Sequence, residues 1–346
     1  MSKVQRECRS AIFLVCSLTS ACTTNMTSVA TFGDATASVA TQTNAVLTKM
    51  PQGCRDNLAL VTQERTLVES VLTAGGIASG KGLSPKNTGA ATMNQASVQS
   101  AIQSHRAALD GMRAALQTAE ESLAKSCEEM EALTPALAGL GTILSSYALG
   151  IKALAQDDFV TYKPELDKLP TSIGAIPRPG VPSETLLTKD QVASISDLQK
   201  LLYKAAIESY RQKKLKQVLD GNNEKVVVDL VDALRQVSTY YVGTLDSVKT
   251  SADALATDAK KLQQEGLLYE PIGLLEVNVR MQGFANATEL KLDAVKEYVA
   301  LLEKVQPAFE KARDSINTVP AQDIVAEVKD FAQSAYEVQQ KMQKAF

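Results

Sequence analysis

The sequence predicts an all-α protein, an elongated bundle of about seven or eight long antiparallel helices with coiled-coil-like packing. Three observations predict this class. The 346-residue chain has no Trp and only 5% aromatic residues, and its body is rich in Ala, Leu, Gln, Lys and Glu, which favour helices. Apolar residues recur every three or four positions, the period of a helix face. We find no alternating run that is typical of a strand.

Residues 34–173 are expected to form an N-terminal helical half. Its first helix begins at Asp34, which is a good N-cap, and ends before Pro51, which cannot continue the hydrogen-bond ladder of a helix. A second helix is predicted from about Arg55 to Ala74, where apolar residues again follow helical spacing.

A glycine-rich segment, residues 75–92, follows this helix. Gly75, Gly80 and Lys81 match the first part of a phosphate-binding loop, but Gly82 stands where a hydroxyl must hold magnesium. No apolar strand precedes the segment. We therefore interpret it as a helix–helix loop, and we predict no nucleotide ligand.

The longest predicted helical segment covers residues 94–157, with an apolar seam that steps by three and four. His105, the only histidine, falls on this seam. It has no partner His or Cys cluster that would make a metal site, so we expect it to reach solvent or a carboxylate. We predict no metal site.

Residues 132–151 carry no charge and are long enough to cross a membrane. Pro135 is expected to kink or break the helix there. We favour a buried central helix; a membrane-inserting segment and a partner-binding surface are the alternatives. The apolar positions that define the segment are Leu137, Leu140, Ile143, Leu144, Tyr147 and Ile151.

Prolines interrupt the helical rhythm before residues 174–188, which we predict to be an extended, Pro-rich connector. Residues 189–346 then form a predicted C-terminal helical half, with Thr188 as the N-cap of its first helix. That helix is predicted to run to about Leu219, and its last turns are basic. A solvated helix face is the first interpretation of these residues and a docking patch the alternative; they are Arg211, Lys213, Lys214 and Lys216.

The N-terminus has the pattern of a signal peptide. Lys3, Arg6 and Arg9 precede an uncharged apolar stretch, which ends in small residues and Cys22. This pattern resembles the bacterial lipobox, although Leu18 lies four residues before the cysteine, where three is usual. The resemblance implies that residues 1–21 are removed and that Cys22 carries acyl chains, palmitate among them. Secretion without acylation is the alternative.

The residue after the lipobox cysteine is Thr23, not Asp, which in the resembled class implies sorting to the outer membrane. We expect residues 22–33 to be the lipidated N-terminus and a flexible tether that holds the body in the periplasm. The membrane is thus a predicted partner through acylated Cys22.

The lipobox resemblance also sorts the five cysteines. Cys8 and Cys16 would leave with the signal peptide, and Cys22 would be acylated. In an oxidising periplasm the remaining two, Cys54 and Cys127, are expected to form one disulfide. Two separate buried thiols are the alternative.

Catalysis usually needs a His, a Cys or clustered carboxylates in a pocket, and the sequence offers no such set. We predict no enzyme activity and no cofactor. A net charge of −3 argues against nucleic-acid binding. The leading hypothesis is a non-catalytic, lipid-anchored periplasmic binding or scaffolding protein with a protein partner in the envelope.

Two other hypotheses stay open. A membrane-active protein, similar to helical pore-forming toxins, would insert residues 132–151 into a bilayer. A bundle that binds a small molecule or a cell-wall fragment would have a concave pocket lined by tyrosines. The candidate tyrosines are Tyr147, Tyr240, Tyr241 and Tyr298.

Overall fold

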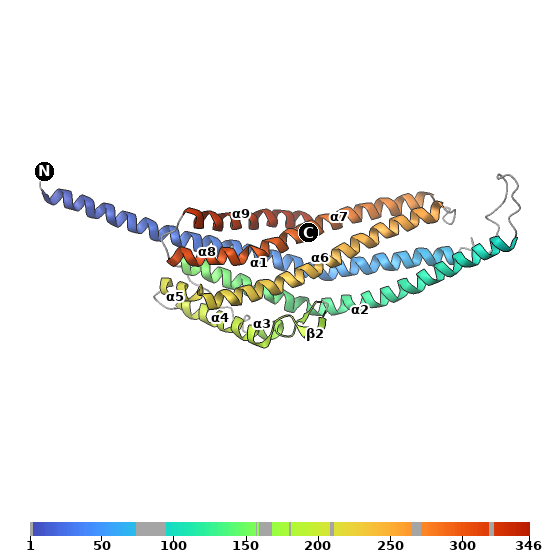
Figure 1. The fold of residues 1–346 in the computed structure, drawn as a ribbon, viewed down its shortest axis with the longest axis horizontal. Coiled ribbons are helices and arrows are strands. Elements are labelled where there is room, and N and C mark those ends of the chain that lie inside the picture. Colours follow the sequence, from blue (N-terminus) through green and yellow to red (C-terminus); the bar gives the residue numbers. More distant parts are fainter. Residues whose placement is uncertain are drawn as a thin grey trace. The chain divides into compact units, whose positions relative to one another are not determined.

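Helices make up most of the described chain (Figure 1). The computed structural model describes residues 3–73, 95–156, 158, 168–179, 181–207, 211–264, 271–317 and 322–346. The elements are α1 (Lys3–Thr73), α2 (Gln95–Ala155), α3 (Leu169–Ile173), β1 (Pro177–Arg178), β2 (Val181–Thr185), α4 (Lys189–Ile207), α5 (Arg211–Val218), α6 (Gly221–Gln264), α7 (Pro271–Glu303), α8 (Val305–Asn317) and α9 (Gln322–Ala345). The side chains of residues 3–25 lie outside this description.

The predicted all-α class is confirmed, and long helices pack antiparallel. Along the α1–α2 pair, residue numbers rise on one helix as they fall on the other: Arg65 pairs with Glu120, and Val71 packs with Leu109. The α6–α7 pair has the same sense: Arg235 of α6 pairs with Glu303 of α7, and further along α6 Val248 and Leu255 share a core with Met281 of α7. Seams of small and medium apolar residues allow this shallow, side-by-side packing.

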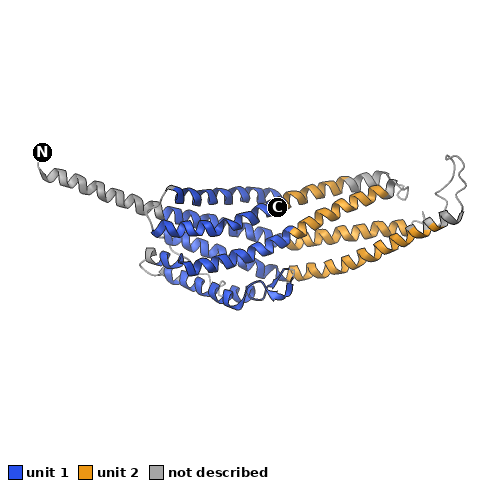
Figure 2. Ribbon diagram, in the orientation of Figure 1, with its two compact units in different colours: residues 1–49, 133–242, 293–346 blue, residues 50–132, 243–292 orange. Residues whose placement is uncertain are grey.

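The chain forms two compact units (Figure 2). Unit 1 contains residues 1–49, 133–242 and 293–346, and unit 2 contains residues 50–132 and 243–292. Each unit therefore takes segments from both sides of the connector, so the predicted halves, residues 34–173 and 189–346, are not the compact units. Antiparallel pairing of long helices brings together segments that are far apart in sequence.

The first predicted helix was wrong at both ends. The helix α1 has no start at Asp34 and continues through Pro51 to Thr73. Asp34 does not cap a helix; its carboxylate pairs with Lys152 of α2 at 2.7 Å. Pro51 is buried, and we attribute the continuity to packing around this position, which offsets the single hydrogen bond that a proline removes. The helix α2 likewise runs through Pro135.

The prediction of a flexible tether over residues 22–33 is also wrong for its described part. Residues 26–33 belong to α1, and Val29 and Phe32 are fully buried. The Phe32 ring lies 5.8 Å from Phe309 of α8 and 6.1 Å from Phe331 of α9, measured between ring centroids. Small, polar residues looked like a linker in the sequence, but here they let neighbouring helices come close.

Residues 26–49 of α1 contact several other helices of unit 1. Thr43 hydrogen-bonds Tyr298 of α7, and the Gln42 amide donates to the Ala335 carbonyl of α9 at 2.9 Å. On another side, a Cβ atom at Gly141 of α2 would lie 2.5 Å from the Asn44 side-chain oxygen. This segment shares the interior of unit 1 with residues 132–151, which the sequence favoured as the central helix.

The connector is more ordered than predicted. Its strands β1 and β2 form an antiparallel hairpin, in which Pro177 is opposite Thr185. Arg178 and Glu184 pair across the hairpin at 2.6 Å. The sequence suggested no strand, because proline-rich segments have a weak strand signal.

After the connector, the positions at which helices begin agree better with the sequence prediction. Thr188 caps α4 as predicted: its hydroxyl accepts from the Gln191 amide at 3.2 Å, and the Gln191 side chain accepts from the Thr188 amide. The predicted single helix that followed is divided into α4 and α5. The chain turns again between α7 and α8 at Lys304, and Pro307 falls in the first turn of α8.

Candidate functional site

The apolar segment at residues 132–151 is part of the interior of unit 1. Its six predicted positions, from Leu137 to Ile151, are all buried, whereas Leu149 on the outer face is 46% exposed. A Cβ atom at Gly150 would overlap the side chain of Leu202 on α4. The folded protein therefore uses this segment for helix packing.

Within the described residues, one helical segment, Arg106–Ala155, has the length and composition to cross a membrane. The most apolar part of it is 61% buried inside the protein. Because a core helix of a folded domain meets the same two criteria, this finding does not by itself indicate a membrane protein.

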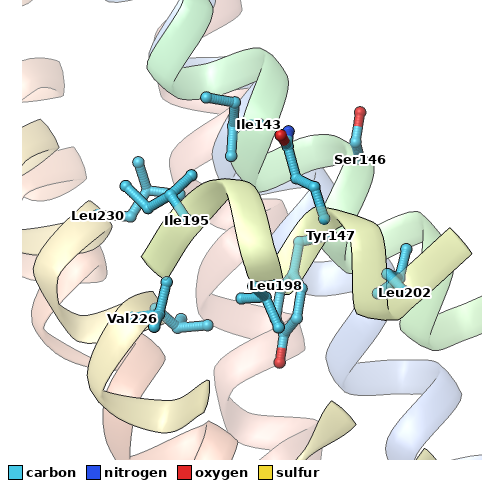
Figure 3. A pocket seen from close by; sticks show the side chains of 10 residues that line it. Ile143, Ser146, Tyr147, Ile195, Leu198, Leu202, Val226 and Leu230 are labelled. Atoms are coloured by element: carbon cyan, nitrogen blue, oxygen red, sulfur yellow. The ribbon is translucent and has the colours of Figure 1, made fainter. Parts of the chain in front are cut away.

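A cavity lies beside this segment, between α2, α4 and α6 (Figure 3). Its walls are mostly apolar, and its enclosed volume is about 20 Å³, which is room for one water molecule. The side-chain nitrogen of Gln199 lines it and is buried without a partner among the described residues. The apolar walls are formed by Ile143, Tyr147, Ile195, Leu198, Leu202 and Leu230.

Such a cavity is too small for an organic ligand, because a small-molecule site is usually several hundred Å³ in volume. Ile195, Leu198 and Leu202 follow the spacing of three and four residues that is typical of a buried helix face. Gln199 had no sequence signal, because a glutamine beside an apolar seam normally faces solvent.

The four candidate tyrosines do not line one pocket. The Tyr147 hydroxyl donates to the Val218 carbonyl at 3.2 Å, and the Tyr241 hydroxyl donates to the Lys49 carbonyl at 3.3 Å. Tyr298 is fully buried, and burial raises the pKa of its hydroxyl well above the ordinary value. Tyr240 is 42% exposed. Three of the four are thus core residues with hydrogen-bonded hydroxyl groups.

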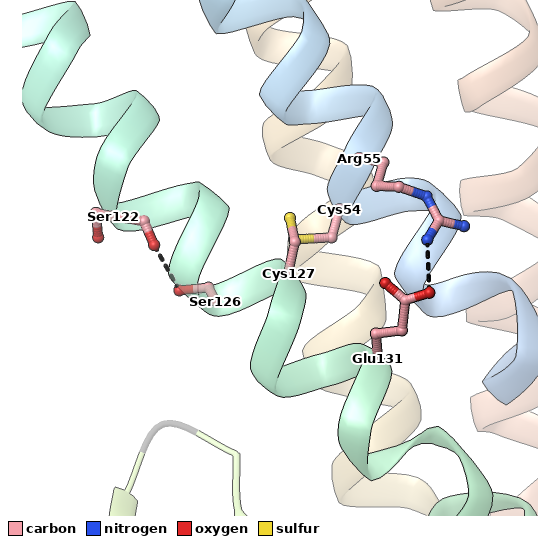
Figure 4. The surroundings of a disulfide bond; sticks show 6 residues. All are labelled: Cys54, Arg55, Ser122, Ser126, Cys127 and Glu131. Carbon is pink, nitrogen blue, oxygen red and sulfur yellow. Dashed lines mark hydrogen bonds and ion pairs between the residues drawn. A yellow bond between two sulfur atoms is a disulfide. The ribbon is translucent and has the colours of Figure 1, made fainter.

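The predicted disulfide joins α1 to α2 in unit 2 (Figure 4). The Cα atoms of Cys54 and Cys127 are 5.5 Å apart, within the range that a disulfide requires. Arg55 and Glu131 form an ion pair beside it at 3.1 Å. The disulfide is confirmed, and it sets the register of this helix pair.

A second link between the same helices is a cluster of charged residues that the sequence analysis missed. The Arg65 guanidinium donates to Glu120 and to Glu69, both at 2.6 Å. The hydroxyl of Thr62 also donates to Glu120. Hydrogen bonds from Arg65 and Thr62 lower the pKa of the Glu120 carboxyl. Only the Arg65–Glu69 spacing of four residues was visible in the sequence.

Glu64, on the same helix as Arg65, is in the opposite situation. Partial burial, and then the nearby negative charge of Asp258 on α6, raise the pKa of the Glu64 carboxyl. No group of three or more His, Cys, Asp or Glu residues in the described chain is arranged to hold a metal ion. We therefore interpret these carboxylates as structural.

Three sequence predictions fall outside the described residues. They are the acylated side chain of Cys22, the glycine-rich loop at residues 75–92, and the environment of the His105 side chain. Comparisons of the chain with protein-family models, with curated proteins and with solved structures found no match.

Proposed function

We propose that this is a lipid-anchored, non-catalytic binding or scaffolding protein of the bacterial envelope, with its body in the periplasm and its anchor in the outer membrane. The disulfide between Cys54 and Cys127 is the observation that carries this proposal. Stable disulfides belong to oxidising compartments, and the lipobox-like sequence before Cys22 supplies the export signal and the anchor.

An exposed apolar face on α7 supports the binding part of the proposal. Val279 and Leu290 are 62% and 63% exposed, and Gly283 and Ala287 between them are exposed as well. Their spacing of four, four and three places them on one side of the helix. A contiguous exposed apolar face of this kind is typical of a protein contact surface.

The anchor is tested on protein purified from membranes of the producing cell. Mass spectrometry of the N-terminal peptide should find Cys22 as the first residue, with acyl chains attached. The Cys22→Ser variant should move to the soluble fraction, while the matched control Cys16→Ser should remain membrane-bound. An N-terminus elsewhere, or an unmodified Cys22, would refute the proposed anchoring.

Membrane activity is the second candidate function, because residues 132–151 are apolar and long enough to span a bilayer. Insertion would require unpacking of this segment from unit 1, since Leu140, Leu144 and Ile151 have no exposed surface. Release of a dye from liposomes by the folded protein would favour this candidate. Intact liposomes at the same protein concentration would favour the scaffolding proposal.

A further inference from the structure

We propose that one end of unit 1 rests on the membrane, the end where α1 becomes buried near Ser28 and which we call the entry point of α1. Lysines of α4 and α5 at this end bind anionic phospholipid headgroups. The orientation rests on the proposed acylation of Cys22. The proposal adds a specific lipid-contact surface: Lys204 on α4, with Lys214 and Lys216 on α5.

The first step is the short distance between the anchor and unit 1. Ser28 and Val29 are buried in unit 1, and Ser28 is only six positions after Cys22. Six residues span about 9 Å as a helix and about 20 Å when fully extended. Without a long flexible tether, this end of unit 1 must stay close to the headgroups.

The second step places α4 relative to the entry point of α1. A Cβ atom at Gly33 of α1 would lie 2.7 Å from the Ala148 carbonyl oxygen of α2. Two residues further along α2, Gly150 packs against Leu202 of α4. Leu202 is therefore at about the level of Gly33, and Lys204 is about 3 Å further along α4.

Lys204 lies beyond Leu202 on the side of the entry point of α1. The same cavity is lined by Ile143 of α2 and Ile195 of α4, while Gly150 meets Leu202, so α2 and α4 run the same way. Because α1 is antiparallel to α2, Lys204 lies at about the level of Ala30 or Thr31. This is about nine residues, or roughly 13 Å of helix, from Cys22.

The third step adds α5, which lies at the same end of unit 1 (Figure 1). Val218, at the end of α5, accepts a hydrogen bond from Tyr147 of α2, and Tyr147 lines the same cavity as Leu198 of α4. The helix α5 therefore runs back along α4, and Lys214, four residues before Val218, lies at about the level of Lys204. Leu215 and Val218 are buried, which fixes this helix on the unit. Lys204 and Lys216 are exposed, and Lys214 is half-buried.

The charge of this corner favours an anionic surface. The α5 sequence, RQKKLKQV, contains no acidic residue. Two acidic residues flank α5 along the chain, Glu208 before it and Asp220 after it. Asp220 accepts hydrogen bonds from the amides of Asn222 and Asn223 at the start of α6, so helix amides partly compensate its charge. Asp158, whose amide donates to the Ala153 carbonyl at the end of α2, is a third acid near this end. The lysines thus form the basic part of a mixed surface.

Vesicle binding tests the surface without the anchor. The mature chain with Cys22→Ser, which carries no acyl group, is sedimented with vesicles of phosphatidylcholine alone or with about 30% phosphatidylglycerol, at about 0.05 M and 0.5 M NaCl. We expect binding only to the anionic vesicles at low salt. At roughly 1 kcal/mol for each basic residue near the surface, K204Q/K214Q/K216Q should bind on the order of 100-fold more weakly.

The matched control removes three exposed lysines from unit 2, as K125Q/K260Q/K261Q, with the same change in net charge. Equal weakening in both triple variants, or equal binding to neutral and anionic vesicles, would overturn the proposal. Circular dichroism checks that both variants fold. In the acylated protein, headgroup-labelled lipid should quench the fluorescence of a fluorophore attached at position 216. The quenching of a fluorophore attached at position 125 is measured for comparison.

The two proposals fail separately. If Cys22 is not acylated but the lysine-dependent binding persists, the anchoring proposal fails and the lipid-contact surface stands. If Cys22 is acylated and the triple variant binds like the parent chain, the anchor stands and the lysine surface fails.

Discussion

A Cβ atom on Gly33 would lie 2.7 Å from the carbonyl oxygen of Ala148. This relationship fixes how closely α1 and α2 approach in unit 1, because only a glycine at this position leaves room for the backbone of the facing helix. The same approach allows Asp34, the next residue, to reach Lys152.

Replacement of Gly33 by alanine should therefore destabilise the protein. The facing atom is a backbone oxygen, so the helices must move apart, at a cost of about 1–3 kcal/mol. Thermal and denaturant unfolding of Gly33→Ala measures the loss. The control is Gly111→Ala, where nothing lies within 4 Å of the added atom; it should gain about 0.5–1 kcal/mol from helix propensity. Equal effects of the two changes would contradict the packing argument.

Removal of the disulfide should lower the stability of unit 2. Cys54 and Cys127 are separated by 73 positions, and closing a loop of that length stabilises a chain by roughly 4 kcal/mol in the chain-entropy treatment. The variant Cys54→Ala/Cys127→Ala should unfold at lower temperature by scanning calorimetry. Reductant should shift the parent protein in the same way and leave the variant unchanged. A variant as stable as the parent would show that packing alone holds the pair.

A charge within the apolar segment should disrupt unit 1. Leu144 has no exposed surface, so Leu144→Lys would bury a cation without a partner and cost several kcal/mol. Loss of the cooperative unfolding transition is the expected result. Leu149→Lys, on the exposed face of the same helix, should unfold like the parent. Normal folding of Leu144→Lys with altered membrane binding would instead favour the membrane-active candidate.

Two glutamates of unit 2 should respond to pH with opposite sign. The pKa of Glu64 is raised above its ordinary value of 4.5 in the folded state, so its ionisation destabilises the fold as pH rises through that range. Glu64→Gln should be more stable than the parent at pH 7, and this difference should disappear well below pH 4.5.

The pKa of Glu120 is lowered in the folded state, first by its hydrogen bond from Arg65. Its contribution is present above the unfolded-state pKa and is lost as pH falls through the lower, folded-state pKa. Glu120→Gln should therefore be less stable than the parent at pH 7 and equal to it in strong acid. The melting temperatures of Glu64→Gln and Glu120→Gln, measured across pH, test these two predictions. Shifts of the same sign relative to the parent protein at pH 7 would contradict them.

Most of the sequence predictions that the structure confirms rest on local patterns. The helical class followed from composition and from apolar spacing, and the capping interaction of Thr188 with Gln191 followed from residue types three positions apart. The pairing of Cys54 with Cys127 followed from counting the cysteines that remain after the predicted signal peptide and acylation site, on the prediction of an oxidising compartment. The spacing within residues 132–151 identified which positions would be buried.

Tertiary structure decided what no local pattern contains. The polar and small residues 26–33 became part of a buried helix because Phe309 and Phe331 pack on Phe32. Packing also explains why α1 continues through Pro51. The free energy lost with one backbone hydrogen bond is small compared with the free energy gained by burying this part of the helix on several sides.

The sequence by itself determined that this chain is helical, which faces of many helices are apolar, and which two cysteines bond. Only the tertiary structure decided the partners of those faces and the two units. The physical reason is that the spacing of apolar residues shows which face of a helix is buried, but not which other helix covers that face. The contact between Thr43 and Tyr298 joins residues 255 positions apart, and such contacts form only once the whole chain has packed.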